Sequence, residues 1–171
     1  SFVPYSGENH PTLVSPNGNF LAIVRNDPNN RAGLIVLDLA QYDLPPIDIS
    51  MPERGDIIGE MLFTADNERL IYTAGGAEGV SNSLFSLDLL TGSERRIRRG
   101  NYGQGVLSPD GRYVAISNWE ILNDDQPPIY TLVTLDLETT AELPLFIGAD
   151  VIEGEVVNQR FAYPLSWRQA R

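Results

Sequence analysis

Three copies of one pattern recur along this chain of 171 residues. Each copy has an apolar run that ends in a hydroxyl residue, Ser15, Thr64 or Ser108, and resumes after a short polar turn. These residues lie 49 and then 44 positions apart. Each copy closes on the tripeptide Leu-Asp-Leu, centred on Asp38, Asp88 or Asp136. A repeat of this length cannot bury both of its faces alone, so we expect neighbouring copies to stack.

Each copy contains four strand-like runs, and a period in the forties with several short strands is the signature of a β-propeller blade. We predict four-stranded blades at about 10–50, 59–99 and 103–147, and the start of a further blade at 159–171. In the same register, Phe2 to Tyr5 corresponds to the outermost strand of a preceding blade. Residues 148–158 are expected to form a loop. The predicted fold class is all-β, with residues 1–171 forming one partial propeller.

The residues of the repeat have a structural explanation before a chemical one. Pro16 and Pro109 preset φ for a turn, and Gly18 and Gly111 supply the positive φ that follows. Short polar side chains in these turns bond their own backbone two residues on, as we expect for Asn17, Asp66 and Asp110. The repeat aspartates occupy equivalent places in separate blades, so we interpret all three as structural.

Composition narrows the function classes. The net charge is −11, and all 12 basic residues are arginine. Such an acidic chain repels phosphate, which argues against a nucleic acid as the partner. The absence of cysteine excludes disulfides, thiol catalysis and cysteine-ligated metals. No run approaches the roughly 18 uninterrupted apolar residues of a membrane span.

A search for catalytic or metal-binding motifs finds none that is specific. There is no Gly-x-Ser-x-Gly elbow, and the only histidine, His10, precedes a proline in a loop-like stretch. The stretches 27–30 and 123–125 offer oxygen ligands for calcium, but neither fits the calcium loop of an EF-hand. The glycine-rich stretch at 100–105 precedes a strand, so it lacks the helix of a dinucleotide site. We therefore expect no catalytic residue, no metal and no cofactor in this segment.

Two surfaces are candidates for binding a protein partner. The loops after the second and fourth strands of each blade open on one face, and an exposed aromatic residue among acids suits protein recognition. This face carries Tyr102, Trp119, Asp124, Asp125, Glu153 and Glu155. The second candidate is a basic strip of four arginines, Arg95, Arg96, Arg98 and Arg99.

The basic strip has two interpretations. One is an outer edge strand that charge protects against stray pairing, and the other is a docking strip for an acidic partner. Strict alternation along a strand would place Arg95, Ile97 and Arg99 on one side, and Arg96 and Arg98 on the other.

The Ser-Pro-Asp-Gly turn, the apolar run after it and the closing Leu-Asp-Leu strand resemble the repeats of the TolB-like propeller family. They are also similar to the propellers of prolyl-oligopeptidase-type peptidases. The resemblance spans about 10–167 and is weakest in blade two, where Thr64 to Asn67 replaces the turn. It implies a non-catalytic binding or scaffolding module in a bacterial, extracytoplasmic (periplasmic or cell-surface) setting. The alternative is the propeller of a larger hydrolase whose catalytic part lies elsewhere.

Propellers are built from about four to eight blades, so three blades leave two apolar sheet faces open. Such faces exceed the patch that a monomer tolerates in water. A longer parent chain, a second copy that completes a six-bladed ring, or a dedicated protein partner would each cover them.

Overall fold

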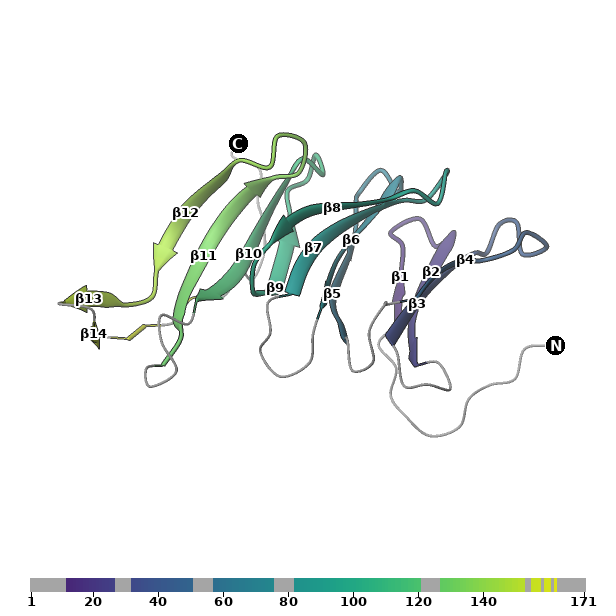
Figure 1. The fold of residues 1–171 in the computed structure, drawn as a ribbon. Helices are drawn as coiled ribbons and strands as arrows, with labels where there is room; N and C mark the ends of the chain where they lie inside the picture. The colour runs from purple at the N-terminus through teal and green to yellow at the C-terminus, as the bar shows by residue number, and fades with distance from the viewer. Residues whose placement is uncertain are drawn as a thin grey trace.

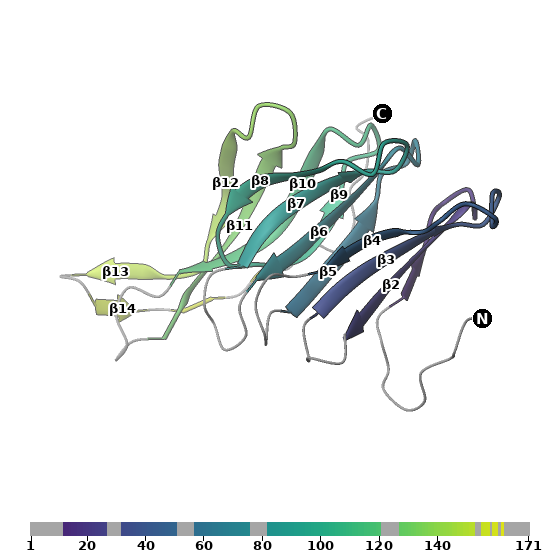
Figure 2. The same cartoon turned by 45° about the vertical axis from the view of Figure 1, so that its right-hand side comes forward.

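The computed structural model describes residues 12–26, 32–50, 57–75, 82–120, 127–152, 155–157, 159, 160 and 162. Within these residues every regular element is a β-strand. Three four-stranded antiparallel sheets follow one another along the chain and stand side by side (Figures 1 and 2). In each sheet the strands are hydrogen-bonded in sequence order. This is the arrangement of three consecutive propeller blades, so the predicted fold class is confirmed.

Each of the three blades contains four strands. Blade one contains β1 (Thr12–Val14), β2 (Phe20–Asn26), β3 (Ala32–Asp38) and β4 (Ile47–Ser50). Blade two contains β5 (Ile57–Phe63), β6 (Arg69–Gly75), β7 (Asn82–Asp88) and β8 (Glu94–Arg99). Blade three contains β9 (Tyr102–Leu107), β10 (Tyr113–Glu120), β11 (Ile129–Asp136) and β12 (Glu142–Ile147).

The expected loop at 148–158 is wrong in part. A two-stranded antiparallel sheet lies there, formed by β13 (Asp150–Ile152) and β14 (Glu155–Val157), with Val151 opposite Val156. The β-branched residues on both sides of a Glu-Gly pair favour this pairing. The outer strand expected at 2–5 lies outside the described residues, and so does the further blade expected at 159–171, apart from residues 159, 160 and 162.

One hydrogen-bonded turn recurs at the start of every blade. In blade three, the Ser108 hydroxyl donates to Asp110 Oδ1 at 2.5 Å and accepts from the backbone N–H of Tyr113 at 2.9 Å. Thr64 makes the same two bonds with Asp66 and Arg69, at 2.5 and 3.0 Å. Ser15 makes them with Asn17 and Phe20, at 2.8 and 2.9 Å. The repeated hydroxyl is therefore the residue that closes the turn between the first two strands.

The turn also requires a left-handed residue three positions after the hydroxyl. Gly18 and Gly111 have φ of 76° and 68°, as the sequence predicts. In blade two the position is Asn67, with φ of 62°. Asparagine tolerates this conformation better than most residues with a side chain, so the turn survives the loss of glycine.

Two apolar cores hold the blades together. The first joins blades one and two and includes Leu34, Val36, Leu70 and Leu87, each at most 1% exposed. The second joins blades two and three and is built from the following residues: Ile71, Leu84, Ile97, Tyr102, Val114, Ile116, Val133, Leu135 and Leu137. Successive residues of β6 supply both cores, Leu70 the first and Ile71 the second, because side chains alternate across a sheet.

Candidate binding site

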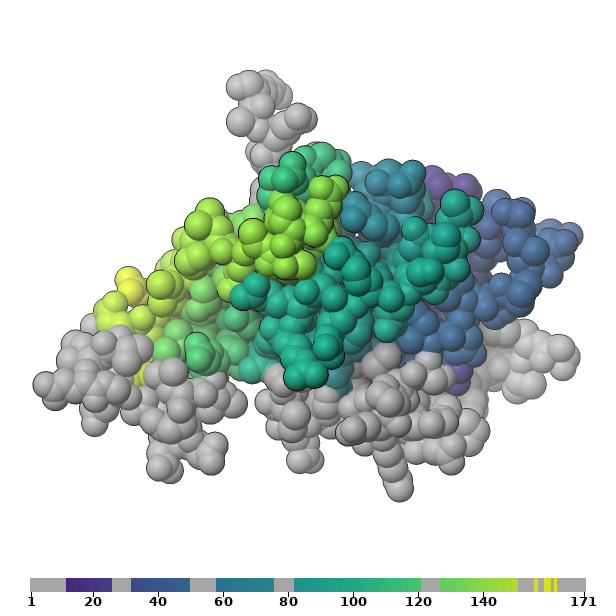
Figure 3. Space-filling model, turned by 45° about the horizontal axis from the view of Figure 1, so that its top comes forward, coloured from purple at the N-terminus to yellow at the C-terminus, as the bar shows by residue number. Residues whose placement is uncertain are grey.

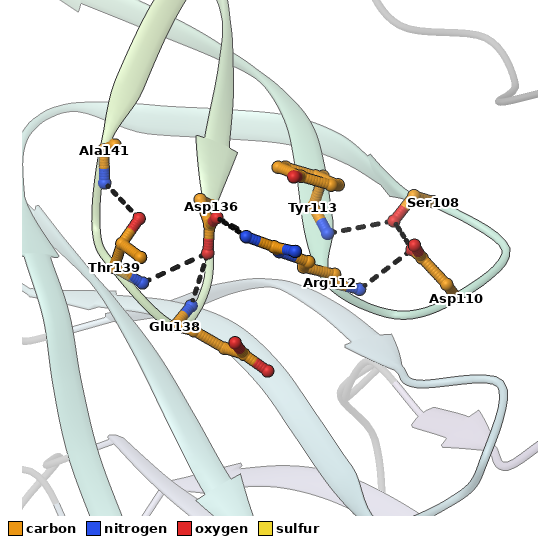
Figure 4. A network of polar contacts seen from close by, with 8 residues as sticks. All are labelled: Ser108, Asp110, Arg112, Tyr113, Asp136, Glu138, Thr139 and Ala141. Atoms are coloured by element: carbon orange, nitrogen blue, oxygen red, sulfur yellow. Dashed lines mark hydrogen bonds and ion pairs between the residues drawn. The ribbon is translucent and has the colours of Figure 1, made fainter.

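The repeat aspartates are structural, as the sequence predicts. Asp136 Oδ1 accepts hydrogen bonds from the backbone N–H groups of Glu138 and Thr139 at 2.9 and 3.1 Å (Figure 4). Asp88 Oδ1 accepts from the N–H groups of Leu90 and Thr91 at 3.0 and 2.7 Å. Asp38 makes the equivalent pair of bonds with the N–H groups two and three residues on. Each carboxylate therefore closes the turn after the third strand of its blade.

An open groove of about 730 Å³ lies between blades one and two. It runs between the turn from β3 to β4 and the turn from β7 to β8, which lie side by side in Figure 3 in blue and teal. Its apolar lining consists of Phe20, Val36, Leu44, Pro45, Ile47, Leu89 and Leu90. Leu44 and Leu90 are 53% and 94% exposed. Large exposed leucines beside a groove are unusual on a monomer and mark a candidate contact surface for a partner.

The groove also carries three carboxylates, those of Asp38, Glu68 and Asp88, and none of the described residues that line it is an arginine. A backbone hydrogen bond from Thr91, aided by the Thr91 hydroxyl, holds the pKa of the Asp88 carboxyl below its usual range. Arg69 lies opposite Asp88 in the ladder between β6 and β7, and its positive charge contributes to this lowering of the pKa. Its guanidinium donates to Gly111 O of blade three at 3.3 Å, outside the groove lining. The groove therefore combines an apolar floor with negative charge.

Arginines occupy the corresponding space between blades two and three. Arg95 stands opposite Ser86 on the outer pair of strands, as Ile47 stands opposite Val36 in blade one. The Arg95 guanidinium donates to Leu137 O at 2.7 Å. Similarly, Arg69 takes the place of Phe20, since each is paired with the repeat aspartate of its blade. Blade one thus has apolar residues at the positions where blade two has arginines that contact the next blade. Because, among the described residues, no such arginine crosses from blade one to blade two, the groove between these two blades stays open.

The basic strip is not four free arginines. Arg98 forms an ion pair with Glu142 at 3.1 Å and donates to Thr140 O at 3.1 Å, so Arg95 and Arg98 both bind blade three. The predicted alternation, with Arg98 on the opposite side from Arg95, is wrong. The ladder from β7 to β8 shifts register so that Leu84 faces Arg98 and Phe85 faces Arg96, which leaves Ile97 as a bulge. Arg96 and Arg99 remain exposed.

The predicted aromatic face is described only in part. Tyr102 is wrong as an exposed residue, because it is 2% exposed and packs in the core between blades two and three. The Asn82 side chain holds its backbone, accepting from Tyr102 N at 2.7 Å and donating to Tyr102 O at 2.8 Å. Trp119 is half-buried near the end of β10. Asp124 and Asp125, Glu153 and the side chain of Glu155 lie outside what the structure describes.

Burial affects the chemistry of Tyr102. Desolvation raises the pKa of its phenol above the usual range, and the nearby Glu142 carboxylate adds to the rise. The hydroxyl donates to Glu142 Oε2 at 3.3 Å. We assign Tyr102 to the packing of blade two against blade three.

Among the described residues, no three histidine, aspartate or glutamate side chains gather as a metal ion would require. In the same part of the chain, no helix has the length and apolar character needed to cross a membrane.

Sequence reasoning missed the groove. The available signal was a departure from the repeat: Phe20 and Ile47 are apolar where blade two has arginine, and Leu90 is apolar where blade three has Glu138. Exposed apolar residues at turn positions that are polar in a sister repeat are a usable indication of a surface site.

No protein-family model matches this sequence, and no curated protein matches it. Solved structures are similar in fold. TolB from Acinetobacter baumannii superimposes with a TM-score of 0.58 at 20% identity, over 85% of this chain and 34% of its own. The β-propeller domain of the Trilobed protease from Pyrococcus furiosus gives 0.55 at 14% identity, over 80% of this chain and 43% of its own. A prolyl endopeptidase gives 0.57 at 16% identity, over 80% of this chain and 21% of its own. The chain thus spans less than half of each of these proteins, and the likeness is to TolB-like and peptidase-type β-propellers.

Proposed function

We propose that this chain is a non-catalytic protein-binding segment of a β-propeller, and that it binds its partner in the groove between blades one and two. The observation that carries the proposal is the pair of exposed leucines, Leu44 and Leu90, that line a groove with an apolar floor. Binding energy in protein interfaces is concentrated where apolar side chains fill such a depression.

The use of the repeat carboxylates supports binding over catalysis. All three are committed to backbone hydrogen bonds in turns. Their equivalent places in the three blades explain their presence without a reaction. The groove departs from the repeat, and departures from a repeat are where function is added to a scaffold.

We further propose that the segment belongs to a larger chain or assembly in a bacterial extracytoplasmic setting. The chain covers only 34%, 43% and 21% of the three similar structures. Blade one and blade three each have an outward face that needs a cover, which a longer parent chain, a second copy or a protein partner would supply. A second candidate is the propeller of a larger hydrolase, which the similarity to peptidase propellers favours. Extending the reading frame discriminates these, since a hydrolase parent encodes a nucleophile elbow and its catalytic partners.

Selection from a random peptide library displayed on phage tests the groove directly, with the whole chain immobilised as bait. Selected peptides are then measured against the double variant Leu44→Ser, Leu90→Ser. The matched control is Leu143→Ser, Leu145→Ser, which changes two leucines of β12 that are 64% and 54% exposed. We expect the groove variant to lose binding and the control to retain it. Failure to select any peptide, or equal binding to both variants, contradicts the proposal.

A further inference from the structure

We infer that the groove between blades one and two recognises a protein segment in which a bulky apolar side chain lies next to arginine or lysine. This inference rests on the proposed function and adds the chemistry of the partner. It follows from three features: the apolar floor, the three carboxylates that line the groove and the contrast with the next pair of blades.

The apolar floor of the groove favours contact with apolar side chains of the bound segment. Phe20 and Val36 come from blade one and Leu89 from blade two, so the floor bridges two blades. Ile47 of β4 and Gly92 of the opposite turn also line the groove, and a Cβ added at Gly92 would stand 3.8 Å from Ile47 Cγ1. A volume of about 730 Å³ exceeds that of one side chain. The groove therefore fits a segment of several residues that inserts one or two apolar side chains.

The negative charge of the groove favours binding of a basic residue of the partner. In blade three, Arg112 lies four residues after the turn hydroxyl and pairs with the repeat aspartate at 2.9 Å. The same position in blade two is Glu68, which places a second carboxylate beside Asp88 in the groove. Asp38 adds a third from blade one. A guanidinium or ammonium group of a partner would supply the cation that blade three supplies for itself.

The corresponding space between blades two and three holds arginines of the chain itself, so a space of this kind accommodates cations. Between blades two and three, Arg95 and Arg98 of β8 donate to the carbonyls of Leu137 and Thr140 in the adjoining turn. The equivalent turn at the groove presents Leu89 and Gly92, and β4 offers it no arginine. The turn beside the groove therefore occupies the position whose carbonyls bind arginine in the next pair of blades, but β4 has no arginine to bind there.

Two synthetic peptides test this chemistry. Both have a central leucine–phenylalanine pair, and they differ only in the flanking residues, which are two arginines in one peptide and two glutamates in the other. Calorimetric titration of each into the whole chain gives the two affinities. We expect the arginine peptide to bind about tenfold more tightly, because its arginines form ion pairs with the groove carboxylates while the glutamates of the other peptide are repelled by them.

Two variants separate the charge from the apolar contact. Glu68→Gln should lower the preference for arginine by about threefold and leave the glutamate peptide unaffected or slightly better bound. Leu90→Ser should weaken both peptides equally, since it removes apolar contact alone. The controls are Glu120→Gln, an exposed residue at the far end of β10, and Leu143→Ser. Thermal melting confirms that each variant is folded.

The outcomes are distinct. Equal affinity of both peptides, lost in Leu90→Ser, overturns the basic partner and leaves the binding function standing. Absence of binding by both peptides and by all library-selected peptides overturns the function as well. A doubling of the solution mass of the free chain that Leu90→Ser abolishes would assign the groove to a second copy and overturn the inference.

Discussion

The guanidinium of Arg112 donates two hydrogen bonds to one oxygen of Asp136, from Nε at 3.2 Å and from Nη2 at 2.9 Å (Figure 4). The accepting atom is Oδ2, while Oδ1 accepts the two backbone N–H groups of the following turn. The hydrogen bonds from Thr139 and Glu138, with Arg112 adding to them, lower the pKa of Asp136 to about 2. One side chain thus ties the first turn of blade three to its last turn.

Asp136→Ala should lower the melting temperature by roughly 3–6 °C, because it leaves the turn N–H groups and Arg112 without their acceptor. Asp136→Asn should cost less, since an amide oxygen still accepts from the backbone. Circular dichroism melts of the three proteins check this order. Equal melting temperatures would contradict the assigned role.

The lowered pKa of Asp136 predicts that the fold loses stability in acid. Because its pKa in the folded chain lies below the ordinary value of 3.8, Asp136 stabilises the fold at neutral pH, and this contribution is lost as the pH falls from about 4 to about 2. Asp136→Asn has no such carboxylate. The difference in unfolding free energy between the natural chain and Asp136→Asn should therefore shrink over this range, as urea unfolding at several pH values would measure. A constant difference would contradict the pKa.

Thr140 has a strained backbone conformation, whereas the equivalent residue of blade two is a glycine, which adopts this conformation without strain. It has φ of 61°, while Gly92 at the same place in blade two has 69°. A β-branched residue in the left-handed region costs about 1–2 kcal/mol. Thr140→Gly should therefore raise the melting temperature by roughly 2–4 °C, and Gly92→Ala should lower it by a similar amount. Differential scanning calorimetry measures both, and a fall with Thr140→Gly would contradict the assignment.

Arg95 and Arg96 are adjacent, exposed and chemically identical, and they provide a matched pair. Arg95→Met removes the bond to Leu137 O and should destabilise the chain by about 1 kcal/mol. Arg96 has no partner among the described residues, so Arg96→Met should change stability by less than about 0.5 kcal/mol. Chemical denaturation of both variants makes the comparison. Equal effects would show that the bridge between blades two and three contributes nothing.

Tyr102 should respond to alkaline pH. Because burial and Glu142 raise the pKa of its phenol, the hydroxyl remains protonated in the folded chain when an exposed tyrosine ionises. The stability that it contributes is present below the ordinary pKa of 10.0 and is lost as the pH rises above it. Tyr102→Phe should remove this part of the alkaline destabilisation. Ultraviolet titration and melts above pH 10 of both proteins test this, and identical alkaline profiles would contradict it.

Much of the fold was predictable because the same pattern of strands and turns occurs three times in the sequence. The hydroxyl of Ser108, the positive φ of Gly111 and the cap of Asp136 are local features, set by residues within five positions of one another. Local geometry of this kind depends on residue type and spacing alone. The four-stranded blades followed from it.

The failures concern contacts between blades. A bulge at Ile97 turned Arg98 toward blade three, and periodicity contains no signal for one extra residue in a strand. Tyr102 is polar enough for a surface, yet its ring lies against Gly100, where an added Cβ would stand 2.8 Å from Tyr102 Cε2. The groove depends on which side chains of blade one face blade two, which requires the stacked structure. Binding sites on repeat scaffolds are consequently harder to predict than the scaffold.

Amide chemical-shift mapping tests the central claim, that partners bind between blades one and two. The labelled chain is titrated with the tightest peptide from the library selection. We expect the largest shifts at Leu44, Leu90 and Thr91, around the groove, and little change at Trp119. Shifts confined to Trp119 and the neighbouring end of β10, with none at Leu90, would place binding on the opposite face and contradict binding in the groove.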